Sequence, residues 1–179
     1  GNDRIPNAGI IYSKDHGKTW NISTLARTNR TESQVAEVEP GVLMLNMRDN
    51  RGGSRAVSTT TDLGKTWKEH ESSRTALQEP VCMASLISVK AKENVLGKDI
   101  LLFSNPNDAK NRHSITIKAS LDGGVTWLPE NQLLLDAGWG WGYSCLTMID
   151  KETVGILYES SVAHMTFQAI KLKDIVKTK

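Results

Sequence analysis

The sequence predicts an all-β fold of the β-propeller class, with about three to four blades of four-stranded antiparallel sheet. Three observations lead to this prediction. An eight-residue motif occurs three times along the 179 residues, a strand-like run precedes each copy, and hardly any stretch shows helical periodicity. Because a stack of so few blades leaves two blade faces unpaired, we expect the chain to be part of a larger ring. A complete β-sandwich is the alternative.

The repeated motif has the form Ser/Thr-x-Asp-x-Gly-x-Thr-Trp and spans residues 13–20, 60–67 and 120–127. Its aspartate can accept hydrogen bonds from nearby backbone N–H groups, its glycine can adopt a positive φ, and its tryptophan can pack the turn onto the sheet. We therefore expect Asp15, Asp62 and Asp122 to build hairpin turns. Each turn offers a single carboxylate, which is too few oxygen ligands for a calcium ion.

Segments of strand length lie before, between and after the motifs. The runs AGIIY, SRAVS and HSITIKA precede the three copies in turn. Further strands are expected at residues 34–38, 42–47, 81–89, 100–104, 143–149, 153–158 and 166–172. This amounts to roughly four strands for every 50 residues, which is the period of a propeller blade.

Composition and charge exclude several kinds of partner. With 22 basic and 20 acidic side chains the formal net charge is +2, so no broad attractive face is expected for nucleic acid or an anionic membrane. No apolar run approaches the roughly 18 residues of a membrane span. Cys82 and Cys145 lie in apolar runs and are expected to be buried, free and unreactive. The histidines are not spaced with other ligands, so neither a metal nor another cofactor is predicted.

The order of strands in a blade indicates which side chains share a face of the ring. In the hairpin whose turn is Pro40-Gly41, Glu32 and Arg48 lie eight residues either side of the proline and should face each other. Tyr143 begins a later strand, and Glu159 ends the strand that returns beside it.

Arg112 falls in the loop between two further strands, at the same face as Glu32, Arg48 and Tyr143. The repeated turns should lie at the opposite face. We therefore expect one tyrosine, carboxylates and two arginines to converge at one mouth of the ring.

The residues then match a known family. The repeated turns resemble the Asp-boxes (BNR repeats) of sialidases, or neuraminidases, which are six-bladed propellers that remove terminal sialic acid. The segment ESQVAEVEPGVLMLNMRDNRG resembles the stretch that holds the glutamate partner of the nucleophile and the second arginine of a triad, here Glu32 and Arg48. LLFSNPNDAKNRHSITIKASLDGGVTW resembles the stretch with the third arginine, Arg112. GWGYSCLTMIDKETVGILYE resembles the stretch around the nucleophilic tyrosine, Tyr143.

The sequence departs from the family pattern at its start. Asp3-Arg4-Ile5-Pro6 copies the Arg-Ile-Pro context of the first triad arginine, but a strand and an Asp-box follow at once, so we interpret Arg4 as a coincidence. Residues 1–179 thus resemble the C-terminal half of the catalytic propeller, without the first arginine and the acid/base aspartate. The resemblance implies sialylated glycans and the missing N-terminal half as partners, and a secreted or periplasmic parent protein.

The function implied by the resemblance is an exo-α-sialidase that hydrolyses terminal α-linked sialic acids with retention, through a tyrosyl intermediate. Tyr143 and Glu32 would be catalytic, and Arg48 and Arg112 would hold the substrate carboxylate. From the residues alone Glu159 is a rival proton acceptor for Tyr143, and the resemblance favours Glu32. The chain alone is expected to be inactive.

Other functions remain open at this stage. One alternative is a non-catalytic Asp-box propeller that binds glycans or proteins, and another is a trans-sialidase. For Trp139 and Trp141 two interpretations also stand: they wall the sugar or its leaving group, or they anchor the loop on the sheet.

Overall fold

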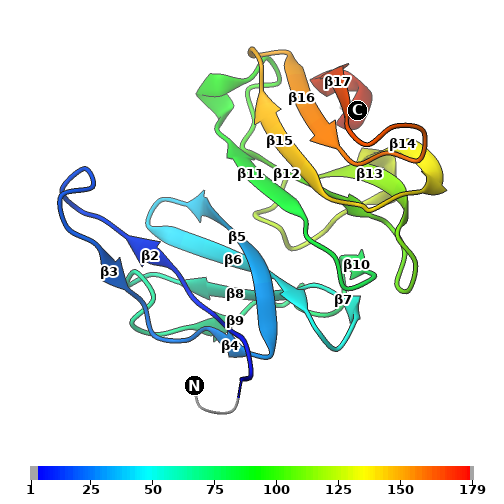
Figure 1. Cartoon of the computed structure of the whole chain (residues 1–179). Helices are drawn as coiled ribbons and strands as arrows, with labels where there is room; N and C mark the ends of the chain where they lie inside the picture. Colours follow the sequence, from blue (N-terminus) through cyan, green and yellow to red (C-terminus); the bar gives the residue numbers. More distant parts are fainter. Residues whose placement is uncertain (1–3, 178–179) are drawn as a thin grey trace.

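The structure is a computed structural model that describes residues 4–177, and it is built almost entirely of antiparallel sheet (Figure 1). The strands form successive groups along the chain, as expected for propeller blades. In the first group, short strands pair two by two: β1 (Asn7–Ala8) with β4 (Arg27–Thr28), and β2 (Ile11–Tyr12) with β3 (Asn21–Ile22).

Two complete four-stranded sheets follow, each with its strands in chain order apart from a short side ribbon. The first sheet contains β5 (Arg30–Glu39), β6 (Val42–Asp49), β8 (Ala56–Thr60) and β9 (Lys68–Glu69), while β7 (Gly53–Ser54) pairs with β10 (Gln78–Glu79). The second contains β11 (Ser85–Val89), β12 (Ile100–Pro106), β13 (His113–Ser120) and β14 (Gln132–Trp139). Short 3-10 helices lie at Ala91–Glu93 and Pro129–Asn131.

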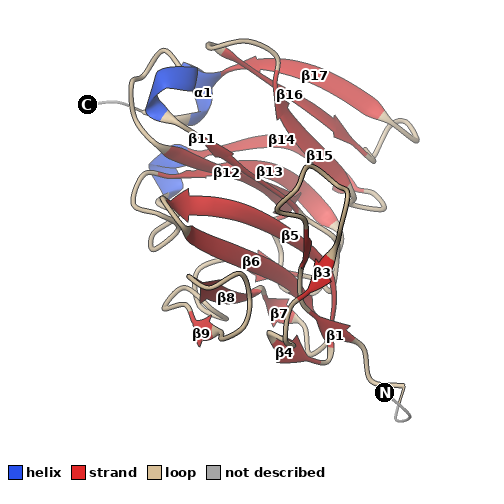
Figure 2. Cartoon of the chain, turned by 90° about the vertical axis from the view of Figure 1, so that its left-hand side faces the viewer, coloured by secondary structure: helices blue, strands red, loops and turns tan. Residues whose placement is uncertain are grey.

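The last sheet has three strands, β15 (Ser144–Met148), β16 (Thr153–Tyr158) and β17 (Thr166–Lys171), and leads into the one-turn helix α1 (Leu172–Ile175). β11 lies against β5 on one side and against β15 on the other, and Figure 2 shows the sheets stacked in this order. A sheet with neighbours on both faces contradicts the β-sandwich alternative, in which only two sheets pack together. The propeller prediction is confirmed.

The hydrophobic core lies between successive sheets, because inner strands such as β12 bury side chains on both faces. One cluster joins the β11–β14 sheet to the β15–β17 sheet around Leu102 and Ile156, and a second joins the β5–β9 sheet to the β11–β14 sheet around Met44 and Phe103. A smaller cluster joins the first group to β6 through Leu45. Burial of these apolar side chains between the sheets determines how the blades stack. It therefore also determines where the loops at their shared rim lie.

The repeated motifs form the predicted turns at the rim opposite the candidate site. Leu43 pairs with Thr60 and Met47 with Ala56, so the second motif starts beside the Pro40-Gly41 turn, at the far end of β6 from Arg48. In each copy the aspartate accepts from the backbone N–H of the threonine four residues later, and the glycine has a positive φ. The turn chemistry predicted from the sequence is confirmed.

The packing of the motif tryptophans varies. Trp127 is 7% exposed and packs with Met44 of the preceding sheet, and Trp67 donates its indole N–H to the Thr24 carbonyl at 3.2 Å. Trp20 is 63% exposed, so the expected packing is wrong for this copy. The reason is geometric, because a motif tryptophan packs against the preceding sheet and Trp20 belongs to the first group of described strands.

Other expectations need correction at the edges of the sheets. The strand Gln132–Trp139 was not predicted, and the expected strand at residues 81–89 begins only at Ser85.

Cys82 is buried, and burial raises the pKa of its thiol to about 11. Cys145 is exposed, against expectation, because β15 alternates between a packed and an open face. Among residues 4–177, no helix is long and apolar enough to cross a membrane.

Candidate active site

The candidate site begins at the hairpin of β5 and β6. Ser33 pairs with Met47 and Gln34 with Asn46, so the register places Glu32 beside Arg48, as predicted. The Arg48 Nη1 donates to Glu32 Oε2 over 2.5 Å. A charge-assisted bond of this length fixes both side chains at the end of the hairpin.

Tyr143 reaches this pair from the segment that leads into β15. Its hydroxyl donates to Glu32 Oε1, and the Arg48 Nη1 lies 3.3 Å from the same hydroxyl oxygen. Tyr143 is half-buried, and the side chains of Arg48 and Glu32 keep 20% and 37% of their surface exposed. The phenol, its hydrogen-bond acceptor and a guanidinium group therefore meet in one place that a solute can reach.

Glu159 contacts the backbone of Tyr143 and not its hydroxyl. The Glu159 Oε2 accepts from the Tyr143 backbone N–H at 3.0 Å, and the Glu159 N–H donates to the Tyr143 carbonyl at 2.9 Å. The predicted pairing of the two residues is confirmed by this pattern. Of the two carboxylates weighed as proton acceptors, Glu32 is the one in contact with the phenol, whereas Glu159 fixes the position of the tyrosine main chain.

Arg112 lies in the loop between β12 and β13, as expected, with its guanidinium carbon 5.9 Å from the centroid of the Tyr143 ring. Its Nη1 donates to the Trp141 carbonyl at 3.0 Å and its Nη2 to the Val81 carbonyl at 3.1 Å. Two backbone carbonyls from different segments thus orient the guanidinium over the tyrosine. The four side chains singled out from the sequence all lie together.

The electrostatics favour a neutral phenol beside an ionised carboxylate at neutral pH. Burial raises the pKa of Glu32, but hydrogen bonds from Tyr143 and Arg48 and the charges of both arginines outweigh it, so its pKa falls below 4.5. The hydrogen bond to Glu32, together with burial and the negative charge, raises the pKa of Tyr143 above 10.0. Arg48 opposes this rise, because its positive charge stabilises a phenolate.

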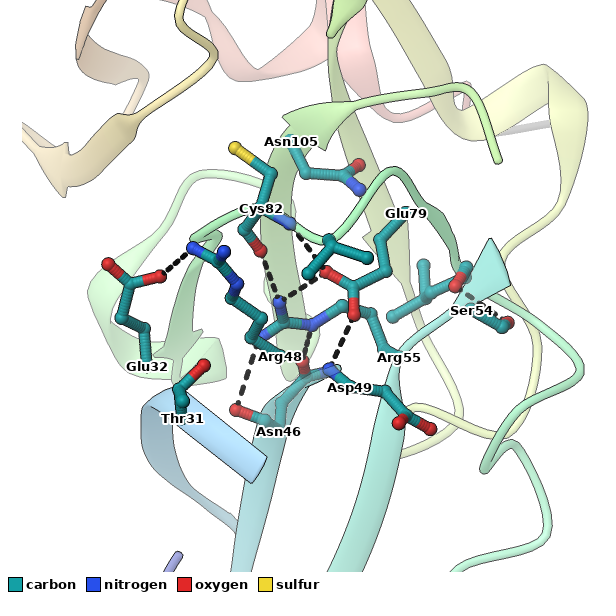
Figure 3. Close-up of polar contacts among 12 residues, drawn as sticks. Thr31, Glu32, Asn46, Arg48, Asp49, Ser54, Arg55, Glu79, Cys82 and Asn105 are labelled. Atoms are coloured by element: carbon teal, nitrogen blue, oxygen red, sulfur yellow. Dashed lines mark hydrogen bonds and ion pairs between the residues drawn. The ribbon is translucent and has the colours of Figure 1, made fainter. Parts of the chain in front are cut away.

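A buried polar network behind the site was not predicted from the sequence (Figure 3). Arg55, directly before β8, and Glu79 on β10 form an ion pair of 3.0 Å in which both side chains are 0% exposed. Arg55 also donates to the Asn46 side chain at 2.7 Å and to the Cys82 carbonyl at 2.8 Å. The pair therefore ties β6 to the segment that follows β10.

The Glu79 carboxylate also joins the same two segments through their backbone N–H groups. Its Oε1 accepts from the Asp49 backbone N–H at 2.6 Å and its Oε2 from the Cys82 N–H at 3.2 Å. Asp49 follows Arg48 directly, and Val81, whose carbonyl holds Arg112, precedes Cys82. The network thus sets the distance between the backbone that carries Arg48 and the Val81 carbonyl that holds the Arg112 guanidinium.

No spacing in the sequence could have revealed this network, because Arg55 and Glu79 are 24 residues apart, with β8, β9 and an irregular loop between them. The one available signal was chemical: a glutamate before Pro80, next to an apolar run, requires a partner when it is buried.

Arg4, interpreted above as a coincidence, is exposed at the start of the described chain. Among residues 4–177, no group of three or more potential metal ligands is found.

Comparison with known proteins agrees with this architecture. The family model for a BNR repeat-like domain matches residues 3–156. The chain is 79% identical over 174 residues to a sialidase of Bacteroides fragilis, covering 97% of this chain and 32% of that protein. It is 34% identical to a sialidase of Micromonospora viridifaciens, covering 83% of this chain and 23% of that protein. The chain therefore spans about a third or less of the length of these two curated relatives.

Solved structures give the same result. A Hadza microbial sialidase superimposes with a TM-score of 0.94 at 75% identity, over 97% of this chain and 34% of that one. The intramolecular trans-sialidase of Ruminococcus gnavus shares the fold, with a TM-score of 0.75 at 24% identity over 93% of this chain and 38% of that one. With the match over residues 3–156, these findings show that the chain belongs to the family of BNR repeat-like domains, as a segment of a sialidase-type β-propeller.

Proposed function

We propose that the complete protein, meaning this chain together with the rest of its propeller, is an exo-α-sialidase that hydrolyses terminal α-linked sialic acids from glycoconjugates with retention. The single observation that carries the proposal is the contact of the Tyr143 hydroxyl with both Glu32 and Arg48. Sialidase relatives, of which one is 79% identical, support the choice of substrate.

Arg48 and Arg112 are proposed to bind the carboxylate of sialic acid. Guanidinium groups present parallel N–H donors that match the two oxygens of a carboxylate. Arg48 lies 3.3 Å from the Tyr143 hydroxyl and Arg112 lies over the ring of the same residue. A carboxylate held by both arginines would bring the adjoining anomeric carbon to the phenol oxygen.

Tyr143 is proposed as the nucleophile. Sialidases with a tyrosine nucleophile are an exception among retaining glycosidases, and the substrate explains why: a neutral phenol is not repelled by the carboxylate beside the anomeric carbon, whereas a carboxylate nucleophile is. The phenol oxygen would attack that carbon while its proton passes to Glu32, and Arg48 would stabilise the negative charge that develops on the oxygen.

The second half of the reaction reverses these roles. Water attacks the anomeric carbon and passes a proton to the conjugate base of the acid that protonated the leaving group, the bond to the tyrosine oxygen breaks, and Glu32 returns its proton to Tyr143. Two displacements at one carbon give retention. The oxygen of the leaving group takes its proton from an acid that we expect the rest of the propeller to contribute, so the isolated chain should show no appreciable turnover of a fluorogenic sialoside.

The test is Tyr143→Phe in the complete protein, assayed by release of sialic acid. The ring that Arg112 contacts is kept and only the reacting oxygen is lost, so kcat should fall by about three orders of magnitude or more. Tyr158→Phe is the matched control, because the Tyr158 hydroxyl is held by Gln168 outside the site. A non-catalytic glycan-binding propeller would show no turnover before substitution and unchanged glycan affinity after it, which would refute the proposal.

A further inference from the structure

A cleft of about 330 Å³ opens between the end of β14 and the loop that joins β16 to β17. Trp139 and Trp141 form one wall and residues 160–164 form the other. The loop begins with Glu159, whose backbone is paired with that of Tyr143. The cleft therefore lies on the rim of the sheets that carries the candidate active site, and in Figure 1 the loop after β16 runs beside β14.

The cleft is preformed, because both walls are fixed by polar contacts. Asp136 on β14 accepts from the Ser161 N–H at 2.7 Å and from its hydroxyl at 2.8 Å. Glycines at positions 138 and 140 let the strand approach the loop closely: a Cβ at Gly138 would lie 2.4 Å from the Ser161 side chain, and one at Gly140 would lie 3.0 Å from two loop carbonyls. A ligand would therefore meet walls that need little reorganisation.

The cleft is joined to the candidate site through Arg112. The Trp141 carbonyl accepts from the Arg112 Nη1 at 3.0 Å, and the Gly140 N–H donates to the Arg112 carbonyl at 2.9 Å. Tyr143 itself is two residues beyond Trp141. A molecule bonded to the anomeric carbon above Tyr143 thus has the cleft next to it, on the Arg112 side.

The two tryptophans expose large apolar surfaces at this position. Trp139 is 62% exposed and Trp141 is 58% exposed, with ring centroids 5.6 Å apart and planes tilted by 59°. Two indoles that turn apolar faces outward on a functional rim indicate a binding surface. Among the lining residues there is no Asp, Glu, Lys or Arg, while Ser161 and His164 offer hydrogen-bonding groups. This chemistry suits a neutral ring with one apolar face.

We propose that this cleft is the subsite for the sugar from which sialic acid is cleaved, a neutral pyranose that stacks on Trp139 and Trp141; the inference rests on the proposed sialidase function. A pyranose presents C–H groups on one face and hydroxyls at its edge, which matches indole walls beside serine and histidine. The volume is at the lower end of the range for ligand clefts, about 300–1,000 Å³, and fits a single ring better than an extended glycan.

The experiment compares two leaving groups in the complete protein. Sialyllactose leaves a sugar that fills the cleft, whereas methyl α-sialoside leaves methanol, which does not. Trp139→Ala should lower the ratio of kcat/KM for sialyllactose to that for methyl α-sialoside by about 5- to 30-fold, which corresponds to about 1–2 kcal/mol. Trp139→Phe keeps an aromatic face and should restore most of the ratio. Ile149→Ala, on the opposite rim and similarly exposed, is the control that should leave the ratio unchanged.

A second measurement uses a free sugar that is not itself cleaved. Lactose should inhibit hydrolysis of methyl α-sialoside by the unsubstituted protein, and Trp139→Ala should weaken this inhibition by a similar factor. The inference is overturned if Trp139→Ala leaves the ratio of the two kcat/KM values unchanged, including the case in which kcat/KM falls equally for both substrates. It is also overturned if lactose inhibits the variant as strongly as the unsubstituted protein. Absence of hydrolysis of both sialosides before substitution would identify the proposed function itself as the failure, and the inference would fall with it.

Discussion

Replacing Glu79 by Gln tests the idea that a buried ion pair holds the site in register. Glu79 is completely buried and accepts three hydrogen bonds, from Asp49 N–H, Arg55 Nη1 and Cys82 N–H. Glutamine keeps one oxygen and replaces the other by an amide NH₂. Because every partner is a donor, that NH₂ faces at least one N–H group that it cannot satisfy, and Arg55 becomes a buried charge without a counter-ion.

The magnitude follows from the burial. Breaking a buried ion pair by removing one partner costs about 3–5 kcal/mol, against a total stability of about 5–15 kcal/mol for a domain. We therefore expect Glu79→Gln to lower the midpoint of urea unfolding, followed by tryptophan fluorescence at pH 7, by about a fifth or more. The double variant Arg55→Met/Glu79→Leu should recover only part of this loss, because it leaves no buried charge but deprives the Asp49 and Cys82 N–H groups of their acceptor.

Activity gives an independent readout in the same variants. Loosening of the segment that contains the Val81 carbonyl releases Arg112, so kcat/KM for a sialoside should fall by about tenfold in Glu79→Gln below its unfolding transition. Glu130→Gln, an exposed change on the short helix before β14, is the matched control. The reasoning is refuted if Glu79→Gln loses less than about 1 kcal/mol, which is the range of an exposed ion pair.

Three further predictions concern single side chains. Glu32→Gln removes the acceptor of the Tyr143 proton and should lower kcat by about 10²–10⁴-fold, with protein stability little changed; a loss below about tenfold would exclude Glu32 as the base. In Asp62, hydrogen bonds from Thr66 and Thr60 lower the pKa from 3.8 to about 2, so the stability that they contribute is present above pH 4 and is lost as the pH falls toward 2. Asp62→Asn should therefore be less stable than the unsubstituted protein at pH 5–7 and equal to it near pH 2, as measured by urea unfolding at each pH; a constant difference would contradict this. Burial lowers the pKa of Lys118 from 10.5 to about 7, so stability should rise between pH 7 and 10; Lys118→Met should flatten that rise and add on the order of 4 kcal/mol at pH 6, and equal stability of the two proteins at that pH would contradict the prediction.

The fold and the main contacts of the site could be predicted because their signals are local or periodic. The repeated turns fix the position of the third strand in each blade, and the Pro40-Gly41 turn fixes the register that brings Glu32 to Arg48. The pairing of Tyr143 with Glu159 follows in the same way from the register of β15 and β16. The choice between Glu32 and Glu159 as partner of the phenol needed the family resemblance, because both lie at the same rim.

The remaining features depend on contacts between blades, which no local pattern encodes. Arg55 meets Glu79 through an irregular loop, and the exposure of Cys145 depends on which face of β15 is covered. The strand Gln132–Trp139 was missed because its glycine-rich end suggested a loop, whereas Gly138 and Gly140 serve to let the chain approach the neighbouring loop. Trp20 was expected to pack because the motif packs in the other copies, but packing requires the preceding sheet.

The most direct test of the account is chemical trapping of the nucleophile in the complete protein. Incubation with 2,3-difluorosialic acid, whose 2-fluorine is the leaving group and whose 3-fluorine slows release of the glycosyl-enzyme, followed by proteolysis and mass spectrometry, should place the sialyl adduct on Tyr143, and Glu32→Gln should reduce the rate of labelling. An active protein that forms no adduct, or an adduct on any other residue, would contradict the claim that Tyr143 attacks the anomeric carbon.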